Sequence, residues 1–497
     1  MLTRRWFIGG VTAFGASVLT RAFAEASDFG TRAPGNLRFG VLSDIHIACS
    51  LKDGHVIRSM PERVRRALEF FRDHSVDAVA ICGDLASFGT KGELQELAKA
   101  WNATFPDGRR PDGAPVEKLF IMGNHDWEGW SYNKFAERFI SPDRMKTDVL
   151  RANIPGVWRS VFDEDFGQFR VKTVKGYEFV LAHWMGNPDV KRNCRGRNED
   201  CLPGVREFYA KRTFDPNRPF FHLQHPMPKG TCFAPFGWGQ DNGDSGAALA
   251  AFPNAIALSG HSHYPLADER AIWQGAFTSV SCGTLASPSN GPLCAGLAAA
   301  RADEAFSLEN SLRKGVATAM AVVEGNADGT CGMIVDVTAE ATRFTRLELP
   351  RGVVLGPDWV VPSAAAEARP FAYAARAKKA VAPEFPSDAV AKATLKSSEG
   401  KQVVSIAFPP ATAVAKARVY DYEITVVSPD GKRLLRHVLA PGYNVAADHP
   451  HAKIGPHCEL AADTIPDVAS CRFEIRPREC FGHAGRPLLL DGAKKCL

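Results

Sequence analysis

Five apolar segments of the chain each end in carboxylate, amide or imidazole side chains. The first three segments end in Asp44-Ile45-His46, in Gly83-Asp84 and in Gly123-Asn124-His125-Asp126. Two later segments end in Gln224-His225-Pro226 and in Gly260-His261-Ser262-His263. One such group alone is common in turns, where Asn and Asp bond to nearby backbone groups. Five groups in this order, with glycines that allow tight turns, predict one shared site.

These side chains offer nitrogen and oxygen donors for metal ions. Such a mixture suits Fe, Mn or Zn rather than Ca²⁺ or an ion selected by thiolates. The chain contains no Cys-x-x-Cys pair, so we expect neither a thiolate zinc site nor a thioredoxin-type centre. The donor set therefore favours a metal centre.

The five groups resemble the motifs of the calcineurin-like metallophosphoesterase family. They read "SDIH", "GDL", "GNHD", "QHP" and "GHSH", and the resemblance covers roughly residues 37–349. It implies an α/β fold of two packed mixed β-sheets flanked by helices. It also implies two divalent or mixed-valence metal ions (Mn, Fe or Zn) and hydrolysis of phosphoric ester bonds by attack of metal-bound hydroxide.

The resemblance further implies a role for each residue. The first metal is assigned to Asp44, His46 and His263, the second to Asn124, His225 and His261, and the bridging position to Asp84. His125 is the implied catalytic imidazole, which stabilises the transition state or protonates the leaving oxygen, a step worth about 10²–10⁴-fold. Asp126 is expected to orient His125 through a ring nitrogen. The neutral amide of Asn124 leaves the centre a net positive charge that attracts phosphate.

The substrate stays open between phosphate diesters and phosphate monoesters such as nucleotides. A diester is favoured because the His125 arrangement would protonate a poor leaving group. The expected partner is a small-molecule or headgroup phosphate ester. Arg192, Arg195 and Arg197 could pair with a second phosphate, or they could belong to a solvated loop tied by Cys194 and Cys201. A non-catalytic, metal-containing surface-binding protein is the less favoured alternative.

In the first third of the chain, predicted strands alternate with predicted helices, and these elements must position the polar groups. Apolar runs predict strands, and apolar residues at helical spacing predict helices. The expected strands cover 37–47, 77–87 and 116–126, and the expected helices cover 61–75 and 91–105. This alternation is typical of largely parallel strands, whose ends collect functional groups.

Further along, the pattern becomes more hairpin-like. A hairpin is expected over 167–184 with its turn at Lys175-Gly176, and strands end near 226 and 263. Antiparallel ribbons are expected over 271–285 and 318–349, the second turning at Asp328-Gly329.

Composition divides the chain into domains. The catalytic domain is expected over 37–350, a linker over 351–369 where Ala and Pro become frequent, and an all-β sandwich over 370–497. The sandwich loosely resembles immunoglobulin-like or fibronectin-like domains. It shows no catalytic group of its own, and we expect it to pack against the catalytic domain.

The segment 1–24 is predicted to be a twin-arginine signal peptide. Arg4-Arg5 precede an apolar run, and Ala22-Phe23-Ala24 forms a small-x-small cleavage site. An ordinary secretory signal is the alternative. We therefore expect the Tat export machinery as a partner and a periplasmic or secreted protein. No later stretch is long and apolar enough for a membrane anchor.

The charge balance limits the classes of partner. Without Arg4, Arg5 and Arg21 of the signal, 57 of the 60 basic residues remain, against 55 acidic ones. A polyanion binder usually carries a larger basic excess, so no specific nucleic-acid binding is expected.

All twelve cysteines follow the signal, and an oxidising compartment would permit disulfides, most credibly between Cys194 and Cys201. Cys82, inside an apolar strand, is expected to be a buried thiol.

Overall fold

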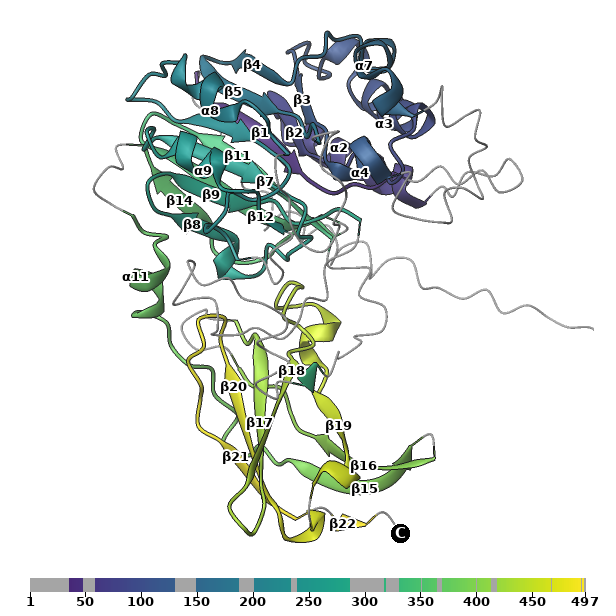
Figure 1. Cartoon of the computed structure of the whole chain (residues 1–497), viewed down its shortest axis with the longest axis vertical. Coiled ribbons are helices and arrows are strands. Elements are labelled where there is room, and N and C mark those ends of the chain that lie inside the picture. Colours follow the sequence, from purple (N-terminus) through teal and green to yellow (C-terminus); the bar gives the residue numbers. More distant parts are fainter. Residues whose placement is uncertain are drawn as a thin grey trace, which may run out of the picture.

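An α/β domain and a β-sandwich make up the described part of the chain (Figure 1). A computed structural model describes residues 35–47, 59–129, 149–186, 201–233, 239–286, 317–318, 330–349, 351–363, 369–398, 400–412, 418–465, 467–492 and 494–495. The signal peptide predicted over 1–24 lies outside these ranges. Among the described helices, none has the length and apolar character needed to cross a membrane.

The first sheet contains the strands that lead to the first three polar groups. Its order is β13-β12-β11-β1-β2-β3, and β14 also pairs with β12. Its strands are β1 Leu37–Leu42, β2 Ala78–Cys82, β3 Glu117–Ile121, β11 Cys331–Val337, β12 Ala341–Glu348, β13 Val353–Val354 and β14 Trp359–Pro362. β1, β2 and β3 are parallel, as predicted, and β11 runs antiparallel to β1. Parallel pairing brings the carboxyl ends of β1, β2 and β3 to one edge.

The second sheet carries the other two polar groups. Its order is β4-β5-β6-β7-β9-β8. Its strands are β4 Phe169–Val174, β5 Tyr177–Ala182, β6 Phe220–Leu223, β7 Ala255–Ser259, β8 Ile272–Gln274 and β9 Thr278–Ser281. The hairpin turn at Lys175-Gly176 and the antiparallel ribbon within 271–285 are confirmed. β5, β6 and β7 are parallel, so the ends of β6 and β7 also lie at one edge.

The two sheets pack face to face, with helices on their outer faces. Phe39 of β1 lies 5.2 Å from Phe179 and 4.9 Å from Phe221, between ring centroids across the sheets. In β2, Ala78, Ala80 and Cys82 face this inner core, whereas the alternate residues face the helices. The helices are α2 Ser59–Asp73, α3 Lys91–Thr104, α4 Asn124–Glu128, α7 Ile154–Phe162, α8 Val205–Ala210 and α9 Asp244–Leu249. The predicted two-sheet fold flanked by helices is confirmed.

Two further sheets form the predicted C-terminal sandwich. Their orders are β10-β18-β17-β20-β21 and β19-β16-β15-β22. The strands are β10 Ala317–Thr318, β15 Lys392–Ser398, β16 Lys401–Ala407, β17 Asp421–Val427, β18 Arg433–Leu439, β19 His457–Ala461, β20 Arg472–Arg478, β21 Leu488–Asp491 and β22 Lys494–Lys495. The short helix α11 Tyr373–Ala377 lies in the segment that connects the two domains (Figure 1). A shared hydrophobic core between the sheets accounts for the sandwich.

Two expectations about this region are corrected. The predicted linker 351–369 contributes β13 and β14 to the first sheet, because their backbone groups pair with β12. The antiparallel ribbon within 318–349 is formed by β11 and β12, so its chain reversal follows Val337. Asp328-Gly329, where we expected the turn, lies outside the described residues.

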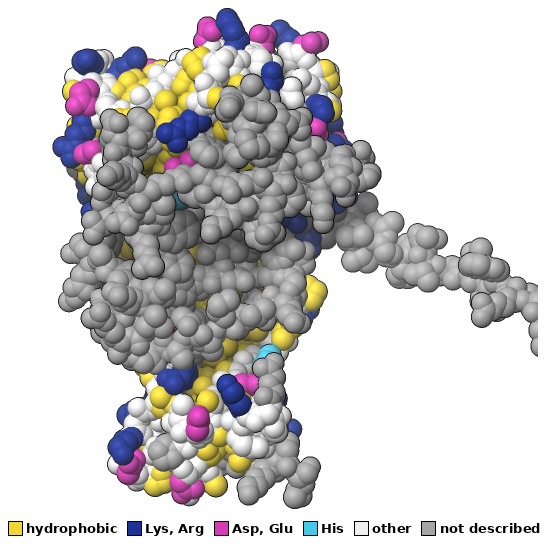
Figure 2. All heavy atoms as spheres, turned by 45° about the vertical axis from the view of Figure 1, so that its right-hand side comes forward, with side chains coloured by type: hydrophobic (Ala, Val, Ile, Leu, Met, Phe, Trp, Pro, Cys, Tyr) yellow, Lys and Arg dark blue, Asp and Glu magenta, His cyan; other side chains and the backbone are white. Residues whose placement is uncertain are grey.

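Basic and acidic side chains are interspersed on the described surface that Figure 2 shows. No disulfide joins two cysteines within the described ranges, and Cys194 falls outside them. The prediction for Cys82 is confirmed, because it is a buried thiol whose sulfur lies 3.8 Å from that of Cys282.

Candidate metal centre

The loops after the parallel strands are bonded to one another. The backbone N–H of Asp44 donates to the carbonyl of Gly83 at 3.1 Å, and that of His46 donates to the carbonyl of Asp84 at 2.9 Å. In the second sheet, the N–H of Gly260 donates to the carbonyl of His225 at 2.8 Å. These bonds fix the relative positions of the loops before any side chain is considered.

Five of the predicted ligands have left-handed backbones. Their φ values are 50° for Asp44, 42° for His46, 52° for Asp84, 69° for His261 and 52° for His263. Residues other than glycine rarely adopt this region, and such strain persists where the surrounding structure holds it in place. Holding these five backbones in the left-handed region costs stability, and it fixes the direction of their side chains.

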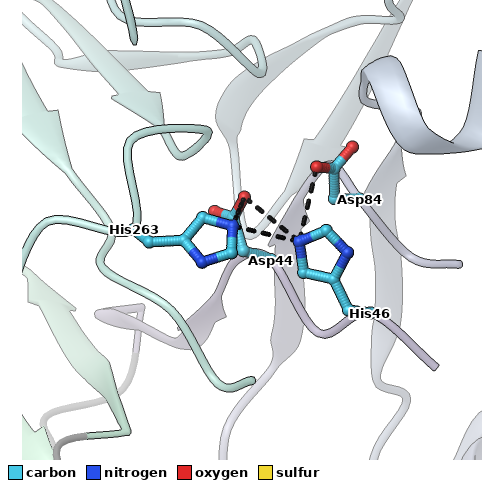
Figure 3. A group of neighbouring side chains, drawn as sticks. All are labelled: Asp44, His46, Asp84 and His263. Carbon is cyan, nitrogen blue, oxygen red and sulfur yellow. Dashed lines mark hydrogen bonds and ion pairs between the residues drawn. The ribbon is translucent and has the colours of Figure 1, made fainter. Parts of the chain in front are cut away.

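Asp44, His46, Asp84 and His263 form one group, with one donor atom from each within 4.8 Å of the others. Figure 3 shows the four side chains pointing toward one another. The Nε2 atoms of His46 and His263 are 3.0 Å apart, and Nε2 of His263 is 3.2 Å from Oδ1 of Asp44. Atoms this close, aimed at a common point, suit the coordination of one ion.

Asp84, His225 and His261 form a second group with the same spacing of donor atoms. The amide oxygen of Asn124 lies 3.0 Å from Nε2 of His225. Nδ1 of His225 is 2.8 Å from the carbonyl oxygen of Cys82, which can only accept, so this nitrogen donates. Metal-binding histidines commonly hold their second nitrogen in this way, and Nε2 is the nitrogen that faces the other donor atoms.

Asp84 belongs to both groups. Its Oδ1 accepts the backbone N–H of His125 at 2.9 Å. Its Oδ2 lies 3.5 Å from Nε2 of His46 and 3.2 Å from Nε2 of His225. One carboxylate thus reaches a donor of each group, as a bridging ligand must.

The protonation states of most of these residues suit a cation. Burial is the main cause that lowers the pKa of His46 and of His261 to about 3, so both rings are neutral at pH 7. Burial would raise the pKa of Asp44 and Asp84, but neighbouring imidazoles lower both below the ordinary range. Neutral imidazoles and ionised carboxylates are the forms that bind metals. The residues present therefore fit the pair of ions that the motifs imply.

Residues 37–265 match the family described as Calcineurin-like phosphoesterase. The chain contains a calcineurin-like phosphoesterase domain. It is a metal-dependent hydrolase that acts on phosphoric esters, and its two His/Asp groups could hold the two ions of a dinuclear site.

Solved structures offer more distant likenesses. The chain is similar to a dimetal phosphatase from Danio rerio, with 10% identity, coverage of 66% of this chain and 99% of that one, and a TM-score of 0.37. It is similar to a purple acid phosphatase from yellow lupin (Lupinus luteus) seeds, with 13% identity, coverage of 67% and 55%, and a TM-score of 0.38. A comparison with curated proteins gave no match.

His125 of the phosphoesterase domain lies beside the predicted ligands. Its ring centroid is 4.6 Å from that of His46, at an interplanar angle of 90°. Its Nδ1 lies 2.8 Å from the carbonyl oxygen of Ser87 and must donate to it. Nε2 is therefore the nitrogen that can hold or release a proton. Sequence reasoning missed Ser87 because it takes part through its backbone, which no residue type reveals.

The expected role of Asp126 is corrected. Its carboxylate accepts the backbone N–H groups of Leu85 at 3.0 Å, Ala86 at 2.8 Å and Gly123 at 2.8 Å. Its two oxygens are thereby directed at the loop that follows Asp84, and the Ser87 carbonyl orients His125 instead. Asp126 ties the third polar group of the phosphoesterase domain to the second.

Two residues near the ligands extend the site. Ser43 donates its hydroxyl to Oδ2 of Asp44 at 2.6 Å, a contact that the sequence did not single out. The ring of Trp184 lies 5.6 Å from the ring of His261. His183 instead accepts the N–H of Met122 at 3.2 Å and is buried in the domain. Arg192, Arg195 and Arg197 lie outside the described residues.

Proposed function

We propose that the phosphoesterase domain hydrolyses phosphate diesters at two bound metal ions of the Mn, Fe or Zn type. The first ion would be held by Asp44, His46 and His263, the second by Asn124, His225 and His261, with Asp84 shared. The observation that carries this proposal is the position of Asp84, whose Oδ2 lies within 3.5 Å of an imidazole nitrogen from each group.

When bound, two such ions activate water and neutralise charge on the phosphoryl group. The chain's own residues supply the rest. Ser87 fixes Nδ1 of His125 as a donor, so Nε2 is available to protonate a leaving oxygen. The neutral amide of Asn124 preserves the positive charge that attracts phosphate. A diester, whose leaving alkoxide is a strong base, gains most from such a proton donor.

Hydrolysis of bis-p-nitrophenyl phosphate beside p-nitrophenyl phosphate tests the proposal. Purified protein without residues 1–24 would be assayed with Mn²⁺, with Zn²⁺ and with a chelator. Faster metal-dependent cleavage of the diester supports the proposal. Faster cleavage of the monoester would make the protein a phosphatase or nucleotidase. Two bound metals without turnover of either ester would favour a non-catalytic surface-binding role.

We also propose that the protein is exported by the Tat machinery and acts in the periplasm or outside the cell on a small-molecule or headgroup phosphate ester. The paired Arg4-Arg5 and the cleavage site at Ala22-Phe23-Ala24 support this location. The test is fractionation of cells that express the full chain or its Arg4→Lys/Arg5→Lys variant. Periplasmic wild type and retained variant support Tat export. Export of both would indicate an ordinary secretory signal.

A further inference from the structure

The residue that follows the ligand His263 lies in the core of the other domain. Tyr264 is 1% exposed, and it packs in the hydrophobic core of the C-terminal sandwich together with Phe233. The two rings meet edge to face, with centroids 4.9 Å apart. A metal-ligand loop of the phosphoesterase domain is therefore anchored in the sandwich, which confirms that the two domains pack together.

Polar contacts complete this anchor. The hydroxyl of Tyr264 donates to Oδ2 of Asp268 at 2.7 Å, because a carboxylate can only accept. The hydroxyl oxygen of Tyr420, a sandwich residue, lies 3.0 Å from that of Tyr264. The only proton of Tyr264 goes to Asp268, so Tyr420 is the donor between the two tyrosines. The sandwich thus supplies a hydrogen bond to the residue next to His263.

A buried ion pair between Arg270 and Asp268 lies against the ring of Tyr420. Arg270 is 0% exposed and forms a 2.7 Å ion pair with Asp268. Its guanidinium lies 3.9 Å from the ring centroid of Phe233 and 4.6 Å from that of Tyr420. Cation–π contact with desolvated aromatic rings stabilises a buried guanidinium. One side of this charged group is therefore covered by the sandwich.

The anchored loop is one that needs support. His261 and His263 both have left-handed backbones, which persist only where neighbouring structure holds them. At its start, the loop is held by the bond from Gly260 to the carbonyl of His225. At its end, the side chain of Tyr264 provides the hold.

We propose that Tyr420 is a positioning residue, through which the C-terminal sandwich holds the Gly260–Tyr264 loop and sets the affinity for the ion that His263 binds. This inference rests on the proposed dinuclear site. It gives the sandwich a role in metal binding that its own sequence does not show.

Metal binding by the full chain with Tyr420→Phe tests this inference. The substitution removes one hydroxyl and keeps the ring over Arg270, so the sandwich core is preserved. Loss of one hydrogen bond should weaken binding of one of the two ions roughly two- to tenfold. Equilibrium dialysis against Mn²⁺ resolves the two binding steps, and thermal unfolding reports on the fold.

Tyr422→Phe is the matched control. Tyr422 is buried two residues further along, and its hydroxyl accepts the N–H of Ala411 at 2.9 Å within the sandwich. This variant should bind both ions as the wild type does. In a Tyr264→Phe background, Tyr420→Phe should add little, because the contact between the two hydroxyls is already lost there.

The outcomes separate this inference from the proposed function. Wild-type affinity for both ions in a folded Tyr420→Phe protein overturns the inference and leaves the dinuclear site intact. Equal losses in Tyr420→Phe and Tyr422→Phe, with equal falls in unfolding temperature, also overturn it, since the effect would then be general destabilisation. A wild-type chain that binds neither Mn²⁺ nor Zn²⁺ removes the dinuclear site and this inference together.

Discussion

Asp84 and His225 face each other inside the phosphoesterase domain, with Oδ2 of the carboxylate 3.2 Å from Nε2 of the imidazole. The same oxygen is 3.5 Å from Nε2 of His46, which belongs to the other ligand group. Both Asp84 and His225 are almost fully buried. A charge placed there without a partner would be costly, so the arrangement is one that a pair of cations completes.

Asp84→Asn should lose both metals and turnover together. The amide keeps the size of the side chain but removes the negative charge that two cations share. Asp77→Asn is the control, because Asp77 is a buried aspartate at the opposite end of β2, paired with Arg110 at 3.3 Å. Metal content by elemental analysis and turnover should fall only in Asp84→Asn. Retained turnover in that variant would contradict the shared role.

Metal affinity should rise with pH because of His225. Burial lowers the pKa of this imidazole, but Asp84 and Asp44 outweigh burial and raise it to about 9 in the metal-free protein. Below that pH an ion must displace a proton from His225, so affinity should increase by about tenfold per pH unit between pH 6.5 and 8.5. Titrations with Zn²⁺ at several pH values, in buffers of different ionisation enthalpy, would measure the released proton. A flat profile without proton release would show that His225 is already neutral.

The gathering of these side chains at one place could be predicted from the sequence because each motif is local. Asp44, Asp84 and Asn124 follow apolar runs directly, and parallel strands bring such ends to one edge of a sheet. The partner of Asp126 could not be predicted in this way. Its neighbour His125 was the obvious candidate, whereas the carboxylate accepts a backbone N–H from Ala86, 40 positions earlier in the chain.

The sequence predicted that the two domains pack together, but not the residue through which they do so. Tyr264 follows the motif "GHSH", and an aromatic residue there is equally compatible with packing inside its own domain. Only the fold places it in the core of the sandwich. Likewise, the Ala- and Pro-rich composition around 351–369 suggested a linker, but pairing with β12 makes part of it sheet. Composition does not reveal which edge strand is available.

His125→Ala should keep both metals and lose turnover. The side chain contributes no donor atom to either ligand group, but its Nε2 is the available proton carrier beside them. A loss of about 10²–10⁴-fold in kcat is expected for a diester. A diester with a very acidic leaving group should lose less, because its leaving oxygen needs no proton. His457→Ala, on an exposed position of β19, serves as the control. An equal loss for good and poor leaving groups would contradict proton donation.

Asp126→Ala should lower the free energy of unfolding and leave the orientation of the His125 ring largely unchanged. The substitution leaves the backbone N–H groups of Leu85, Ala86 and Gly123 without their acceptor. Each buried donor left unsatisfied costs about 1–3 kcal/mol, so a loss of about 3 kcal/mol or more is expected in urea unfolding. Asp165→Ala, which breaks only an exposed pair with Arg159, should change stability by less than about 1 kcal/mol. Unchanged stability with reduced kcat would instead support the orienting role expected from the sequence.

Gly260→Ala should abolish binding of the ion held by Asp44 while the protein stays folded. A Cβ at position 260 would lie 1.8 Å from Oγ of Ser43 and 2.4 Å from Oδ2 of Asp44, far inside contact distance. Neither side chain can easily withdraw, because the Ser43 hydroxyl oxygen lies against the carbonyl of Cys82 at 3.0 Å, and Asp44 accepts the N–H of His261. Gly92→Ala is the matched control, since its Cβ would meet nothing within 4 Å on helix α3. That change should raise stability by up to about 1 kcal/mol and leave metal content unaltered. Two metals bound with wild-type affinity in Gly260→Ala would show that the loop yields without moving Asp44, and the close approach would then have no part in metal binding.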